Sequence, residues 1–179
     1  MLNDAAAAGA NAGVGAVFAP ALLDAMRAPR AVLEIVCLAP DGGQKWRERC
    51  ENLVTTAGKT DIVDKYLKGS SYTAAWYCML KGAGSIAAGD TLASHAGWTE
   101  ATPYSGNRPA ITWGTTSSGS NTSSAVSISI NATATVAGAG IASVNTGTSG
   151  VLYNMADFSA SRSVASGDTL TVVFTISVS

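Results

Sequence analysis

The chain has 179 residues, a formal net charge of -1 at pH 7, and 47% hydrophobic but only 13% charged residues. This length suits one domain that buries its own core, so no cofactor is needed for stability. The near-neutral charge argues against a nucleic-acid partner, because such binding depends on a clustered basic field. A surface poor in long charged side chains is typical of proteins whose surface meets other protein.

Charge is concentrated in the first part of the chain. Between residues 109 and 179 the only Lys, Arg, Asp or Glu residues are Asp157, Arg162 and Asp168. A sheet built from this part must cover itself with hydroxyl groups, and we expect its edges to be covered by other protein.

The first 29 residues are predicted to form an N-terminal arm that becomes ordered on a partner. Asn11, Pro20 and several glycines leave residues 5–23 barely apolar, so we do not expect a membrane span. No Lys or Arg precedes this run, so we do not expect a signal peptide either. Pro20 favours a short helix after it, whose apolar stripe packs either on its own domain or on a partner. The candidate contact residues of the arm are Phe18, Leu22, Leu23 and Met26.

The pattern then changes to that of a β-hairpin. Residues 31–38 are a β-branched apolar run, residues 40–43 are a turn cluster, and residues 44–54 form the return strand. Charged residues alternate along the return strand, so one of its faces points to solvent or to a partner. Arg47 and Arg49 are the candidate contact residues on that face.

A short helix is predicted over residues 60–68, with Thr60 as its N-cap and Gly69 as its stop. Asp61 and Asp64 would then lie near the positive end of the helix dipole, which explains them better than acid–base chemistry does. The helix carries an amphipathic stripe made of Ile62, Val63, Tyr66 and Leu67.

The remainder is predicted to consist of strands and turns. The last strand, residues 166–179, alternates apolar and hydroxyl side chains, which is typical of a half-buried strand. The other predicted strands are residues 72–80, 110–114, 125–136, 139–144 and 151–155, with a hydroxyl-rich loop over residues 115–124. Together with the hairpin this makes roughly eight strands and one helix, which fits an all-β, jelly-roll-like sandwich.

Residues suited to catalysis are few. His95 is the only histidine, with Asp90 and Glu100 nearby in sequence, but no nucleophile elbow, second histidine or ligand spacing accompanies it. We therefore expect no enzymatic activity, metal site, cofactor or small-molecule substrate, and a structural role for His95.

The cysteines are Cys37, Cys50 and Cys78, an odd number without metal-ligand spacing. They are expected to be reduced thiols that pack as small hydrophobic side chains. A disulfide between Cys37 and Cys50 is geometrically conceivable, because these two residues flank one turn.

Three aromatic residues lie in turn-rich passages: Trp98, Tyr104 and Trp113. Aromatic faces in the loops of a β-sandwich can stack on sugars, so a glycan-binding adhesin module is one hypothesis. The other interpretation is that these side chains anchor the core and the loops. Trp98 and Tyr104 are kept as candidate contact residues.

Several segments carry a resemblance to a known family. The main ones are NLVTTAG (52–58), DIVDKYLKG (61–69), YTAAWY (72–77) and AGDTLASHAGWTE (88–100), and residues 104, 108–109, 131–135, 152–153, 162–164 and 167–170 extend the match. Over about residues 30–179 the chain resembles a family of small virion proteins of tailed bacteriophages. The best-understood relatives are capsid cement or decoration proteins with a jelly-roll-like β fold.

The resemblance implies a non-enzymatic structural protein that is made in the cytoplasm of the bacterial host and stabilises the capsid shell from its surface. Its partners would be the major capsid protein and neighbouring copies of itself, as a dimer or trimer. A tail, fibre or connector component is the alternative within the virion. The residues alone, without this resemblance, indicate a soluble all-β interaction module.

Overall fold

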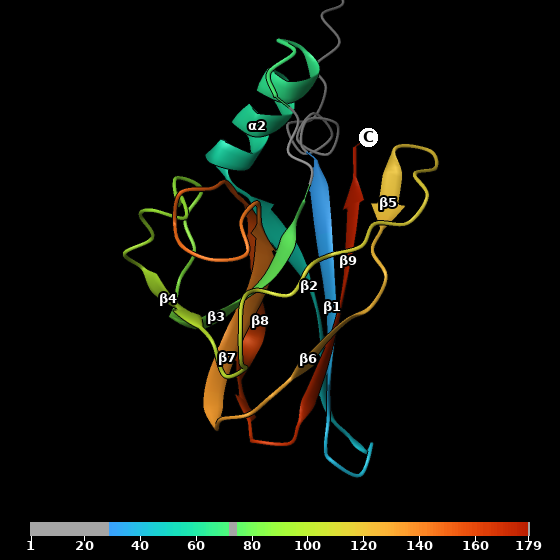
Figure 1. Cartoon of the computed structure of the whole chain (residues 1–179), viewed down its shortest axis with the longest axis vertical. Coiled ribbons are helices and arrows are strands. Elements are labelled where there is room, and N and C mark those ends of the chain that lie inside the picture. Colours follow the sequence, from blue (N-terminus) through green and yellow to red (C-terminus); the bar gives the residue numbers. More distant parts are fainter. Residues whose placement is uncertain (1–28, 72–74, 179) are drawn as a thin grey trace, which may run out of the picture.

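The computed structural model describes residues 29–71 and 75–178, and in this part the protein is all-β with one helix (Figure 1). The predicted arm lies outside the described residues, apart from Pro29. The elements are β1 (Arg30–Leu38), β2 (Gln44–Val54), α2 (Thr56–Tyr66), β3 (Tyr77–Gly84), β4 (Trp98–Ala101), β5 (Ser120–Thr122), β6 (Val126–Ser129), β7 (Ala134–Ala142), β8 (Leu152–Val164) and β9 (Thr169–Ser177). The described part contains no helix long and apolar enough to cross a membrane.

Strand β2 joins the two layers of the fold because it changes partner along its length. Its first part pairs with β1 in the predicted hairpin, whereas Leu53 and Val54 pair with β8. The full order is β4-β3-β7-β8-β2-β1-β9-β5, with β6 also on β9, and every pairing is antiparallel. The jelly-roll connectivity stays a prediction. In this fold β2 pairs with β1 in one layer and with β8 in the other, so the two layers are hydrogen-bonded to each other through β2.

The main core lies between these layers. The alternation predicted for the last strand is confirmed over residues 170–174, because Leu170, Val172 and Phe174 are fully buried while the residues between them are partly exposed, but it does not extend to Val178, which is exposed. In register with them on β1 lie Cys37, Ile35 and Leu33, which are buried too. Full burial of an apolar side chain of this size contributes roughly 1.5–3 kcal/mol.

A second apolar cluster covers the opposite face of the β3-β7-β8 layer. It contains Met79, Leu92, Trp98, Leu152 and Met155, all nearly or fully buried. Leu92 comes from the loop between β3 and β4, so this loop covers the outer face of the layer. The β3-β7-β8 layer is therefore buried on both faces.

Each of the three charged residues between residues 109 and 179 forms an ion pair with a residue of β2 or β3. The pairs are Lys81–Asp157 (2.8 Å, Nζ to Oδ1), Glu48–Arg162 (2.7 Å, Oε1 to Nε) and Lys45–Asp168 (2.6 Å, Nζ to Oδ2). One member of each pair is buried. The other member of each pair is partly exposed, so these pairs connect strands near the surface, which in residues 109–179 is otherwise rich in hydroxyl groups.

Gly138 leaves room for the pair that contains Lys81, a fully buried lysine. Lys81 on β3 lies opposite Gly138 on β7, which in turn lies opposite Asp157 on β8, so the lysine side chain must cross β7 to reach its partner. A Cβ atom at Gly138 would come 3.2 Å from Lys81 Cδ and 2.1 Å from the Ala156 carbonyl oxygen. A side chain at this position would therefore clash with the β8 backbone and crowd the Lys81 side chain.

The helix begins earlier than predicted. Thr55, not Thr60, is the N-cap, and its hydroxyl accepts a hydrogen bond of 3.0 Å from the Gly58 amide. Asp61 and Asp64 consequently lie away from the first turn, and the helix-dipole interpretation of these residues is wrong. They form i,i+4 ion pairs instead, Asp61 with Lys65 and Asp64 with Lys68.

Several strand boundaries also differ from the prediction. Residues 110–114 form only isolated bridges rather than a strand. The predicted strands over residues 125–136 and 139–144 are separated at a different place. The break falls at residues 130–133, between β6 and β7, where the Ile130 amide donates a hydrogen bond to the Asp168 carbonyl. Strand β8 continues to Val164, and β5 lies inside the predicted loop over residues 115–124. Hydroxyl-rich strands of this kind carry little hydrophobic periodicity.

Asp168 generates a pH-dependent prediction. Its carboxylate accepts hydrogen bonds from the Lys45 ammonium (2.6 Å) and the Ala165 amide (2.8 Å), and the bond from Lys45 chiefly lowers its pKa. A pKa lowered by folding stabilises the fold above the unfolded-state pKa, and this stabilisation is lost as pH falls through the folded-state pKa. Asp168→Asn should therefore lower the free energy of unfolding by about 1–2 kcal/mol at pH 7. The effect is modest because Lys45 is partly exposed and solvent weakens the ion pair.

The measurement is urea denaturation of the native protein and the variant as a function of pH. The difference between them should shrink as the pH is lowered through the acidic range. Asp41→Asn, in the exposed β1–β2 turn, is the matched control and should show a smaller difference. A difference for Asp168→Asn that stays constant down to about pH 3 would contradict a role for the charge.

Candidate interaction site

Helix α2 is fixed to one end of the sandwich by close backbone contacts. The Thr55 amide donates to the Tyr153 carbonyl over 3.1 Å, which ties the N-cap to β8. Gly58 lies so close to the same carbonyl that a Cβ atom would approach its oxygen to 2.3 Å. The position of the helix is thus set by its first turn, and Figure 1 shows α2 projecting beyond the strands at the end where β9 finishes.

The predicted apolar stripe of the helix is mostly not used in the core. Ile62 alone packs against the main cluster. Val63, Tyr66 and Leu67 are 49%, 86% and 72% exposed. Val178, after the end of β9, is the fourth large hydrophobic residue exposed within the described ranges 29–71 and 75–178. Apolar side chains gathered on an exposed helix are typical of a protein-interaction surface.

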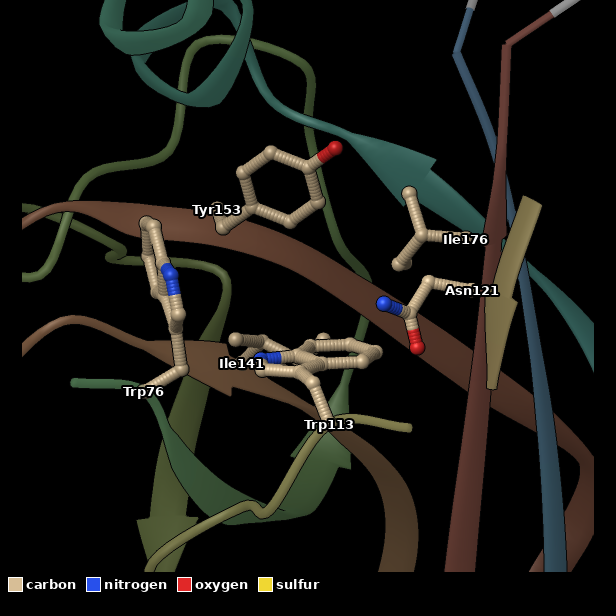
Figure 2. Close-up of a pocket in the computed structure, with 6 residues that line it drawn as sticks. All are labelled: Trp76, Trp113, Asn121, Ile141, Tyr153 and Ile176. Atoms are coloured by element: carbon tan, nitrogen blue, oxygen red, sulfur yellow. The ribbon is translucent and has the colours of Figure 1, made fainter. Parts of the chain in front are cut away.

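An apolar cavity of about 210 Å³ opens between the layers near α2 (Figure 2). Its lining comes from separate parts of the chain: Trp76, Trp113, Asn121, Ile141, Tyr153 and Ile176. The rings of Trp76 and Tyr153 meet edge to face, with 5.4 Å between their centroids. The side chains labelled in Figure 2 surround a common space, with α2 above Tyr153.

Buried amide groups lie on the same inner face as this cavity. Asn52, Ala31, Ile176 and Asn121 occupy one row across β2, β1, β9 and β5, so their side chains share a face. Both side-chain polar atoms of Asn52, and Oδ1 of Asn121, are buried without a partner in the described part of the chain. A buried polar group without a hydrogen bond destabilises the fold by about 1–3 kcal/mol. At this end of the core some polar side chains are therefore left without hydrogen-bond partners.

Arg47 and Arg49 lie on the outer face of the hairpin, as predicted. Both contact Glu34, at 2.7 Å and 3.2 Å, and all three side chains are well exposed. The hydrogen bond from Arg47, together with that from Arg49, lowers the pKa of Glu34 against the opposing effect of desolvation. The arginines are thus partly neutralised, and their role as partner contacts stays a prediction.

Trp98 and Tyr104 offer no exposed ring face. Trp98 is 4% exposed, stacks on His95 with 4.0 Å between the ring centroids, and donates from Nε1 to the Asp90 carboxylate over 2.8 Å. Tyr104 is 8% exposed. Their burial does not support the contact role predicted for them, because both rings are used in packing the chain itself. His95 also hydrogen-bonds the Trp98 carbonyl, in agreement with the structural role predicted for it.

The remaining predicted contact residues are Phe18, Leu22, Leu23 and Met26, which lie outside the described residues. The cysteines are free thiols. Cys37 lies opposite Trp46 and Cys50 opposite Leu33, so the two are four positions apart along β1. That is roughly 13 Å, too far for a disulfide without rearrangement of the hairpin.

Within residues 29–71 and 75–178, no group of three or more His, Cys, Asp or Glu side chains could hold a metal ion. No protein-family model and no curated protein sequence matches the chain. Hypotheses about its function therefore rest on its own residues and geometry and on the resemblance of its segments described above.

The close approach of Gly58 to β8 generates a prediction. Alanine forms helices better than glycine by about 1 kcal/mol, yet Gly58→Ala should lower the free energy of unfolding by about 1–3 kcal/mol because its methyl group would clash with the Tyr153 carbonyl. Urea denaturation measures this effect. The control is Lys59→Ala at the exposed neighbouring position, expected to stay within about 0.5 kcal/mol. A Gly58→Ala variant as stable as the native protein would contradict the seating of α2 by its first turn.

Proposed function

We propose that the protein is a non-enzymatic structural component of a tailed-phage virion that binds and stabilises the capsid shell as a decoration or cement protein. The observation that supports a role in attachment is the position of helix α2, which is fixed to the sandwich by its first turn and exposes Val63, Tyr66 and Leu67. The assignment to a virion is supported by the resemblance of about residues 30–179 to small virion proteins of tailed bacteriophages.

The mechanism of this proposal is the burial of surface area. Exposed apolar side chains lose water when they meet a partner, at roughly 25 cal/mol per Å² of apolar area. A standard interface buries about 1,600 Å² in total, and repetition over a shell multiplies modest contacts. In this proposal α2 and the end of the sandwich beside it contact the shell, and the N-terminal arm adds further area there.

The edges of the sheet favour contact through the helix rather than through added strands. At the two ends of the strand order, β4 has four residues and β5 has three. Short edge strands offer few unpaired backbone groups, so they limit edge-to-edge association. Self-association as a dimer or trimer remains part of the proposal and would use side-chain surfaces.

A pair of substitutions on α2 tests the proposal. Tyr66→Ser with Leu67→Ser should leave the fold intact, because both side chains are exposed, and should weaken binding to shells that lack this protein by at least about tenfold. Co-sedimentation with such particles measures the binding. Gln44→Ser, exposed at the opposite end of the hairpin, is the control and should bind normally. Undiminished binding of the α2 variant would rule out the helix as the attachment surface.

A further inference from the structure

The cavity lies where the described chain begins. Ile176, which lines the cavity, is the strand partner of Ala31, and Arg30 pairs with Ser177. Neighbouring strands are about 4.8 Å apart, so the chain enters β1 directly beside the cavity. Met26 is five residues before Ala31, and an extended chain of that length spans up to about 17 Å. The residues that precede β1 can therefore reach the cavity of the same molecule.

The chemistry of the cavity suits an apolar side chain. Tryptophan, tyrosine and isoleucine dominate its lining, and the rings of Trp76 and Trp113 are only partly buried. Within the ten residues before β1, the large apolar side chains are Leu22, Leu23 and Met26. Burying each of them fully contributes about 1.5–3 kcal/mol, so the three together are of the same order as the roughly 1–2 kcal/mol per residue that ordering residues 22–26 costs.

We propose that the cavity is the docking site for residues 22–26 of the same chain, with Leu22, Leu23 and Met26 placed against Trp76 and Trp113. A tethered segment has an effective concentration in the millimolar range, so the cavity's own segment is favoured over that of a second copy. The docking would hold the rest of the arm at the end of the molecule that carries α2. This inference goes beyond the proposed function, since it concerns the free protein and does not depend on a shell.

The test uses the full chain and its own tryptophans as reporters. Leu22→Asp, Leu23→Asp and Met26→Asp are combined in one variant, and Ala6→Asp, Ala7→Asp and Ala8→Asp in a control with the same change of charge. Acrylamide quenching of tryptophan fluorescence is measured for both and for the native protein, with far-UV circular dichroism to verify the fold. A deletion of residues 1–28 is the second variant, in case the triple substitution perturbs folding.

If residues 22–26 shield the tryptophans of the cavity from acrylamide, quenching should be stronger in the triple variant and in the deletion than in the native protein. Quenching of the control variant should equal that of the native protein. The increase should disappear when Trp76→Phe and Trp113→Phe are added, and protection in the native protein should not depend on its concentration. Equal quenching in the native protein and the triple variant would overturn the proposal. Protection that appears only at high protein concentration would overturn it as well, because a second copy would then be the occupant.

Discussion

The antiparallel pairing of β1 with β9 is the constraint on which the rest of the structure depends. The two strands pair over the whole of β1, from Arg30 opposite Ser177 to Leu38 opposite Thr169, although about 140 residues of sequence separate them. The layer that contains β1, β5 and β6 cannot close until this last strand is in place, so much of the fold depends on non-local contacts. The same pairing sets one wall of the cavity and fixes where the chain enters β1.

The few charges of the C-terminal half explain the character of the surface. Asp157, Arg162 and Asp168 all form ion pairs with residues of β2 and β3, and only Asp157 and Arg162 also reach the surface. The exterior of this half is therefore rich in serine and threonine, and apolar exposure is concentrated on α2. A molecule whose exposed large apolar side chains gather at one end is suited to binding one surface in a defined orientation.

The sequence predicts those parts of the fold in which hydrophobic periodicity is strong. The hairpin of β1 and β2 and the alternation of β9 are recovered because alternate residues face the core. The start of α2 is predicted too late, because a glycine at position 58 is typical of a break after a strand. Only the tertiary contact of Gly58 with the Tyr153 carbonyl explains why a glycine lies inside the helix. The cavity was not predicted at all, since Trp76, Trp113 and Ile176 are brought together only by tertiary structure. Of these three residues, only Trp113 was a candidate in the sequence analysis, where its aromatic side chain in a turn-rich passage suggested a binding role.

The most direct test of the central claim is the copy number of this chain in purified particles from its source, measured against the major shell protein. The account predicts a number comparable to that of the shell subunits, because attachment by a repeated surface contact follows the shell lattice. A handful of copies would indicate a tail, fibre or connector component instead. Absence of the chain from particles would contradict the proposed role in the virion.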